Sequence, residues 1–109
     1  MAKKVDMEAK KAAISKEISE VMKALGELHE EVMKDGALSA KTKELMLVAM
    51  AVALKCEYCL WNHVPIAVKM GATREEIMEA VSTAILISGG TAVAYGSAVV
   101  LEILDELNV

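Results

Sequence analysis

The chain has 109 residues, the size of one domain, and 55% of them are hydrophobic although only 3% are aromatic. Its net charge of −4 argues against a nucleic-acid-binding surface, and two cysteines are too few for a disulfide-built secreted scaffold. The charged N-terminus lacks the apolar stretch of a signal peptide, so we expect a reducing cytoplasmic location.

The first predicted element is a long amphipathic helix over about residues 6–34. Charged side chains dominate this region, since residues 1–44 hold 18 of the 28 charges. Its larger apolar residues recur at steps of three and four and form one stripe: Ile14, Ile18, Val21, Met22, Leu25, Leu28, Val32 and Met33. Asp35-Gly36 predicts the end of this helix, with Gly36 in the left-handed conformation.

A second helix is predicted from an N-cap at Ser39 to about Leu54. Residues 45–54 are apolar on every side, so we expect this helix to be buried all round.

Two further helices are bounded by recognisable capping residues. The third runs over about residues 56–70, with Gly71 as its cap and with Pro65 removing a hydrogen bond. The fourth runs over about residues 73–88 and opens on a capping box, Thr-Arg-Glu-Glu, which begins at Thr73.

A last helix is predicted over about residues 91–107. The 22 residues from Ala80 to Leu101 carry no charge and could span a bilayer by length. Because Gly89-Gly90 lies at their centre among several hydroxyl residues, we expect two helices meeting at a turn and no membrane span.

The fold class is therefore all-α: a single compact domain over residues 1–109 with about five to six helices. The N-terminal helix precedes a catalytic helical core at about residues 39–107. This core has more apolar surface than one small bundle can enclose, so we expect a homo-oligomer with helical interfaces rich in Ala, Gly and Val.

The residues of chemical interest begin the third helix. Cys56-Glu57-Tyr58-Cys59 is a Cys-x-x-Cys pair, and His63 lies one helical turn beyond Cys59 on the same face. The start of a helix favours a thiolate, and a neighbouring imidazole can remove the thiol proton.

Glu44 joins these residues through the expected helical hairpin. If the two helices meet near residue 55, the antiparallel return brings His63 within one turn of Glu44. A carboxylate there could orient His63 and exchange a proton with it. The predicted relay runs from Glu44 through His63 to Cys59.

Other interpretations of these residues are weighed beside this one. Zinc would use both cysteines and His63 but would need a fourth ligand, such as His29 or a second subunit. Haem attachment requires a histidine where the chain has Leu60, and a thioredoxin module requires a βαβ pattern that is absent. We therefore expect no metal and no cofactor.

The remaining polar and aromatic candidates are expected to be structural. His29 lies beside two glutamates and is interpreted as a surface residue. Trp61 is interpreted as a core or interface residue, and Tyr58 could either pack or line the thiol pocket.

The spacing Glu44, Cys56-x-x-Cys59, His63 resembles the signature of the AhpD-like alkylhydroperoxidases of the carboxymuconolactone decarboxylase family. The flanking segments 41–45, 71–77, 89–90 and 94–96 agree with it, so the resemblance covers roughly residues 20–107. It implies an all-helical fold, trimers or hexamers, and thiol-dependent reduction of hydroperoxides.

By this resemblance Cys59 attacks the peroxide, His63 acts as its base, Glu44 completes the relay and Cys56 resolves the sulfenic acid to a disulfide. The opposite roles of the cysteines stay open. An external dithiol or redox protein would be the reducing partner. The alternatives are a cofactor-free decarboxylase acting on a muconolactone-like substrate and a non-enzymatic redox-sensing or zinc-stabilised oligomer.

Overall fold

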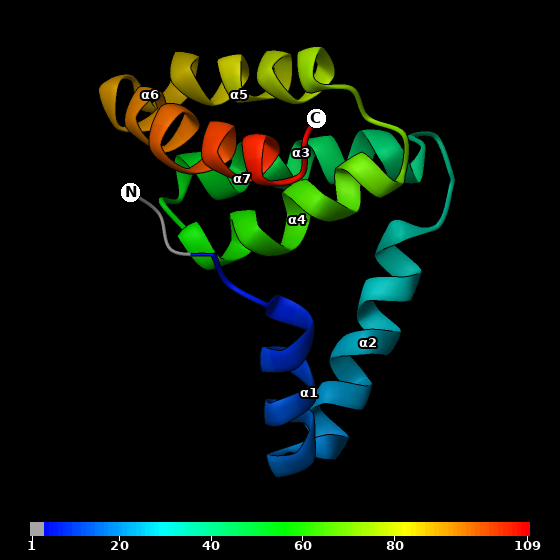
Figure 1. The fold of residues 1–109 in the computed structure, drawn as a ribbon. Helices are drawn as coiled ribbons and strands as arrows, with labels where there is room; N and C mark the ends of the chain where they lie inside the picture. Colours follow the sequence, from blue (N-terminus) through cyan, green and yellow to red (C-terminus); the bar gives the residue numbers. More distant parts are fainter. Residues whose placement is uncertain (1–3) are drawn as a thin grey trace.

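The computed structural model describes residues 4–109, and every regular element in that range is helical. In chain order the elements are α1 (Met7–Glu17), α2 (Ser19–Met33), α3 (Ala40–Ala53), α4 (Glu57–Lys69), α5 (Arg74–Ser88), α6 (Gly90–Tyr95), the π-helical turn η1 (Gly96–Val100) and α7 (Leu101–Glu106) (Figure 1). The predicted all-α class is confirmed.

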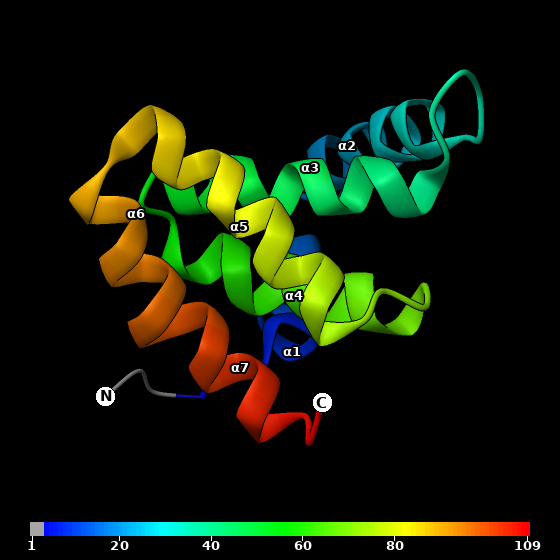
Figure 2. The ribbon, with the colours of Figure 1, turned by 90° about the horizontal axis from the view of Figure 1, so that it is seen from above.

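The core lies where α3, α4, α5 and the last helical segment meet. Helix α3 packs against both α4 and α5, and α7 packs against α4 (Figure 2). The largest fully buried apolar side chains of this core are those of Leu60, Ile77, Ile103 and Leu104. Trp61 also belongs to this cluster, which confirms its interpretation as a core residue.

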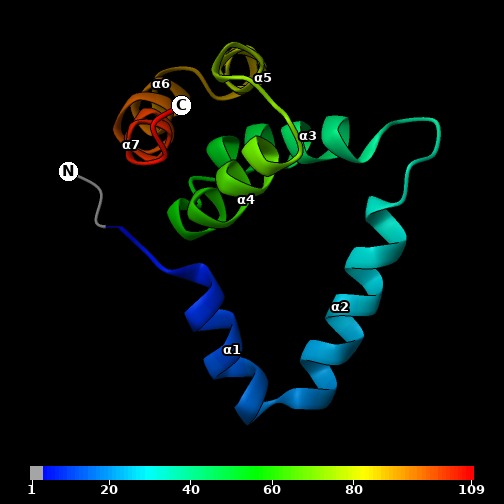
Figure 3. The ribbon, with the colours of Figure 1, turned by 45° about the vertical axis from the view of Figure 1, so that its right-hand side comes forward.

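The first two helices form an arm, residues 7–33, that leaves the core and returns to it as a V (Figure 3). The prediction of one helix over 6–34 is therefore wrong, because Ile18 adopts φ −133° and ψ 58° and breaks it. An unbroken helix of that length would extend roughly 43 Å away from its start. The break lets α2 turn back, so that Met33 at its end is buried.

Helix α2 ends without the predicted left-handed glycine. Its C-cap, Lys34, has φ −60° and ψ 142°, and Gly36 is not among the residues of positive φ. Lys43 Nζ instead donates to the carbonyls of Val32 at 2.7 Å and Lys34 at 2.6 Å. A lysine of α3 thus satisfies two carbonyls at the end of α2, of which that of Val32 would otherwise be capped by a Schellman turn.

Helix α3 begins as predicted, since the Ser39 side chain accepts a hydrogen bond from the backbone N–H of Thr42 at 3.1 Å. The expectation that it is buried all round is wrong. Met46 and Met50 are each nearly half exposed, whereas Val48 and Val52 are fully buried. Within one chain, only one side of α3 faces α4 and α5.

The caps of α4 and α5 are confirmed. Helix α4 continues through Pro65 and ends at Lys69, and Gly71, which follows the C-cap residue Met70, has φ 94°. Both hydrogen bonds of the Thr73 capping box are present, with Glu76 as the N3 residue.

The last predicted helix is divided but lies where it was expected. Gly89 has φ 63° and forms the turn between α5 and α6, which confirms the predicted helix pair. At Gly96, an added Cβ would lie 2.9 Å from Cγ1 of Val81, so any larger residue here would force one of the two helices or the Val81 side chain to shift. Across residues 4–109, no helix has the length and apolar character needed to cross a bilayer.

Candidate active site

The candidate site is built at the tight turn that joins α3 to α4. Helix α3 ends in a Schellman motif: Lys55 has φ 58° and donates to Val52 O, and the N–H of Cys56 donates to Ala51 O at 2.9 Å. Cys56 is also the N-cap of α4. A single residue therefore closes one helix and opens the next, which fixes the position of its sulfur.

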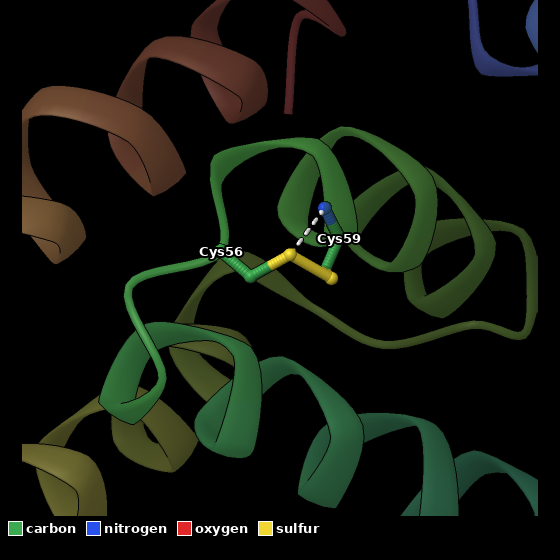
Figure 4. The surroundings of a disulfide bond; sticks show 2 residues. All are labelled: Cys56 and Cys59. Atoms are coloured by element: carbon green, nitrogen blue, oxygen red, sulfur yellow. Dashed lines mark hydrogen bonds between the residues drawn. A yellow bond between two sulfur atoms is a disulfide. The ribbon is translucent and has the colours of Figure 1, made fainter.

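Cys56 and Cys59 are joined by a disulfide, with their Cα atoms 5.2 Å apart (Figure 4). The backbone N–H of Cys59 donates to Cys56 Sγ at 3.3 Å, which is the dashed line in Figure 4. Both cysteines are partly buried, and Cys59 packs against the core. The pair is thus held at the first turn of α4, where N–H groups and the helix dipole favour a thiolate after reduction.

Glu44 and His63 form the second half of the site. Oε1 of Glu44 and Nδ1 of His63 are 2.5 Å apart, and the Glu44 side chain is fully buried while that of His63 is 19% exposed. Because a buried carboxylate is costly without a partner, the imidazole is what makes this position tolerable. The contact uses Nδ1, so the other ring nitrogen, Nε2, remains for chemistry.

The structure brings the four predicted residues together in two pairs. Glu44 reaches His63 across the α3–α4 hairpin, and Cys59 lies one turn before His63 on α4. The hydrogen bonds of the described residues include none between His63 and either sulfur. Oε2 of Glu44 likewise has no partner among them. The arrangement can therefore pass a proton between acid and imidazole beside a dithiol.

His63 also lines a cleft of about 650 Å³ between the arm and helices α3 and α4. His29, Lys11 and Asn62 line the same cleft, and Lys11 Nζ donates to Asn62 Oδ1 at 2.8 Å. Lys11 and Asn62 were not singled out from the sequence; His29 was considered as a fourth zinc ligand, and its interpretation as a surface residue is confirmed, since it is exposed. No local signal joins Lys11 to Asn62, which lie 51 positions apart in the chain.

The described residues, 4–109, contain no group of three or more His, Cys, Asp and Glu side chains arranged to hold a metal ion. Tyr58, between the cysteines, is 65% exposed, so it does not pack in the core.

Residues 19–102 match the sequence profile of the carboxymuconolactone decarboxylase family. The chain belongs to this family. A relative from Paracoccus denitrificans, "Uncharacterized protein 4 in cox locus", is 41% identical over 81 residues, which cover 74% of this chain and 72% of that protein. An uncharacterized protein of Cupriavidus necator is 39% identical over 69% of this chain and 66% of its own length.

Solved structures agree with this assignment. A carboxymuconolactone decarboxylase family protein from Legionella pneumophila, crystallised in its apo form, has a TM-score of 0.86 at 38% identity and covers 95% of this chain and 92% of its own. A family protein from Thermotoga maritima has a TM-score of 0.71 at 32% identity over 79% of this chain and 88% of its own. The description of the Thermotoga protein offers a part in the antioxidative response as a possibility.

Proposed function

We propose that this chain is a thiol-dependent peroxidase that reduces hydroperoxides through Cys56 and Cys59, with Glu44 and His63 as a proton relay. The observation that carries the proposal is the fully buried Glu44 paired to His63, one helical turn from a Cys-x-x-Cys disulfide. Family membership and the antioxidative description of the Thermotoga protein support the same chemistry.

The proposed reaction has three steps. The Cys59 thiolate, after His63 takes its proton, attacks the outer oxygen of ROOH; the O–O bond breaks, and the proton passes to the departing RO⁻ to give ROH and Cys59 sulfenic acid. The Cys56 thiol then attacks the sulfenic sulfur, which releases water and forms the disulfide. An external dithiol reduces this disulfide by exchange and is itself oxidised.

Two observations bear on which cysteine attacks first. The one-turn spacing places Cys59 beside His63 and favours Cys59 as the peroxide-attacking residue. The hydrogen bond from the Cys59 N–H to Cys56 Sγ would stabilise a thiolate on Cys56 and favours the opposite assignment. We propose Cys59 as the attacking residue, because a base in reach of the thiol is what the first step requires.

Hydroperoxide consumption with a dithiol reductant tests the proposal. The reduced wild-type chain should lose two thiols per chain on stoichiometric hydroperoxide and regain them with the dithiol. Cys59→Ser should abolish turnover, and Cys56→Ser should leave a sulfenic acid on Cys59 that a sulfenic-acid-selective nucleophile, such as a cyclic 1,3-dione, traps. A sulfenic acid trapped only in Cys59→Ser would reverse the two roles.

Tyr58→Phe serves as the matched control, since it alters the residue between the cysteines without removing a sulfur. Turnover that survives loss of both cysteines would overturn the peroxidase. In that case, release of carbon dioxide from a muconolactone-like acid would support the decarboxylase that the family name describes.

The proposed enzyme works with an external dithiol or redox protein in a reducing cytoplasm, as a trimer or hexamer of this chain. Zinc analysis of protein purified without chelator separates it from a zinc-stabilised oligomer. One equivalent of zinc per chain would favour the non-enzymatic alternative.

A further inference from the structure

The cleft beside His63 is an open groove with mainly apolar walls and the volume of a small-molecule site. Its volume of about 650 Å³ falls within the range of 300–1,000 Å³ typical of small-molecule sites. Helix α2 supplies one apolar wall, and α3 and α4 supply the other. The apolar side chains along these walls are Met22, Leu25, Leu28, Val32, Met33, Leu47 and Ile66.

The polar side chains that line the cleft are those of Lys11, His29, Glu30, Asn62 and His63. Lys11 Nζ contacts Asn62 Oδ1, which leaves the Asn62 amide N–H groups to donate elsewhere. Among the ion pairs of residues 4–109, none includes Lys11. This polar corner therefore offers a positive charge without a paired carboxylate, together with an amide donor.

We propose that the cleft binds an amphiphilic carboxylate, that is, a hydrocarbon chain with one carboxylate head. The head would contact Lys11 and Asn62, since an ammonium and an amide complement a carboxylate. The chain would lie along the apolar walls and remove their exposed leucines from water. Leu25 and Leu28 are each more than half exposed in the structure.

The proposal also names a substrate class, and this part depends on the proposed function. If His63 serves a peroxidatic thiol, the preferred hydroperoxides are those carried on a carboxylate-bearing hydrocarbon chain. The carboxylate would lie at Lys11 and Asn62, in the corner of the cleft that includes His63, so the peroxide group would be carried near the carboxylate end of the chain.

Calorimetric titration with decanoate tests the binding. It is carried out on the full chain with Cys56→Ser and Cys59→Ser, so that no sulfur chemistry contributes. We expect one decanoate per chain, and affinity that falls by about fourfold for each CH₂ removed on going to hexanoate. Lys11→Met should weaken decanoate binding by about tenfold.

Three comparisons make the result specific. Lys10→Met, at an exposed neighbour that does not line the cleft, should leave the affinity unchanged. Asn62→Asp should abolish binding, because the new carboxylate neutralises Lys11. Glu30→Gln should not weaken binding, since it removes a negative charge from the lining of the cleft and so removes repulsion of the carboxylate.

Absence of saturable decanoate binding would overturn the proposal. So would equal binding of decanoate and decyltrimethylammonium that Lys11→Met leaves unchanged. If decanoate binds but the wild-type chain consumes no hydroperoxide, the proposed function fails and the binding site stands. If hydroperoxides turn over without decanoate binding, only the present inference fails.

Discussion

Glu44 is the one fully buried charged side chain among the described residues, and packing does not account for it. Its neighbours along the buried side of α3 are Val48, Ala51 and Val52, so the environment would suit an apolar residue. Replacing a buried ion pair with apolar residues is often neutral or stabilising. The acid at this position is better explained by what it does to His63, whose Nδ1 it contacts at 2.5 Å.

Replacement of Glu44 by Gln should separate its chemical role from its structural one. Glutamine has nearly the same shape and can still accept a hydrogen bond from Nδ1, but it cannot hold the positive charge that His63 gains as a base. We expect the rate of hydroperoxide reduction to fall by about 10²-fold, the lower range for general acid–base catalysis. The measurement is turnover across a pH series.

The matched control is Glu79→Gln, which alters an exposed glutamate of α5 and should leave turnover unchanged. A merely structural role for Glu44 would show as a lower Tm with an unaltered pH–rate profile. A Glu44→Gln chain with full activity at every pH would remove Glu44 from the relay.

Among the individual residues, the pairing of Glu44 with His63 was predicted from the sequence, but the contact between Lys11 and Asn62 in the cleft was not. Counting along two antiparallel helices brings Glu44 and His63 together, because they lie eleven residues before and eight residues after the turn near residue 55 and are thus within about one helical turn of level. Lys11 meets Asn62 because the beginning of α1 lies beside α4, and counting along the α3–α4 hairpin does not give the direction in which α1 leaves the core.

The helices themselves show which boundaries are set locally. Ser39, Gly71, Thr73 and Gly89 were predicted as caps or turns, and each was confirmed, since side-chain capping and left-handed glycines depend on a few adjacent residues. The break at Ile18 has no such signal: a β-branched residue within an amphipathic stripe is ordinary in a helix. It follows from the return of α2 to the core, which is a tertiary effect.

The capping box of α5 should contribute measurably to stability. In Thr73→Ala, the N–H of Glu76 loses its side-chain acceptor, which lies at 3.1 Å, so we expect the free energy of unfolding to fall by about 1 kcal/mol. Urea denaturation measures this change. Thr83→Ala is the matched control, because Thr83 bonds only to Ala80 O within the helix. An equal loss in both variants would contradict a specific capping role.

Glu76 should make that contribution pH-dependent. The hydrogen bond from the Thr73 backbone, with Lys41 beside it, lowers the pKa of Glu76 below its usual value. A carboxyl whose pKa is lower in the folded chain adds stability above its unfolded pKa, and this is lost as the pH falls through the folded value. In Glu76→Gln the amide still completes the box. At neutral pH, Glu76→Gln should therefore be less stable than the wild type, and the difference in the free energy of unfolding should shrink as the pH is lowered. A difference that does not change with pH would show that the charge of Glu76 does not contribute.

As a whole, the single chain leaves much apolar surface uncovered. It exposes 6975 Å², whereas a compact monomer of this mass would expose about 5,900 Å². The excess, about 1,100 Å², is larger than the roughly 800 Å² that each partner buries in a standard interface. The most exposed apolar side chains of α5 are Leu86, at 88%, and Ile87, at 83%, and Leu54 at the end of α3 is 77% exposed.

This surface leads to the last prediction, that the chain assembles through the exposed ends of α3 and α5. Sedimentation of the wild type at micromolar concentration should give three or six times 11.7 kDa. Leu86→Glu would place a carboxylate in the interface and should shift the mass to 11.7 kDa, whereas Leu38→Glu, at a 45% exposed loop residue, should not. The excess area would then be buried in contacts between copies. This would explain why the second half of the chain has more apolar residues than a single copy can bury. A wild-type chain that sediments as a monomer would leave these side chains in water and contradict the assembly.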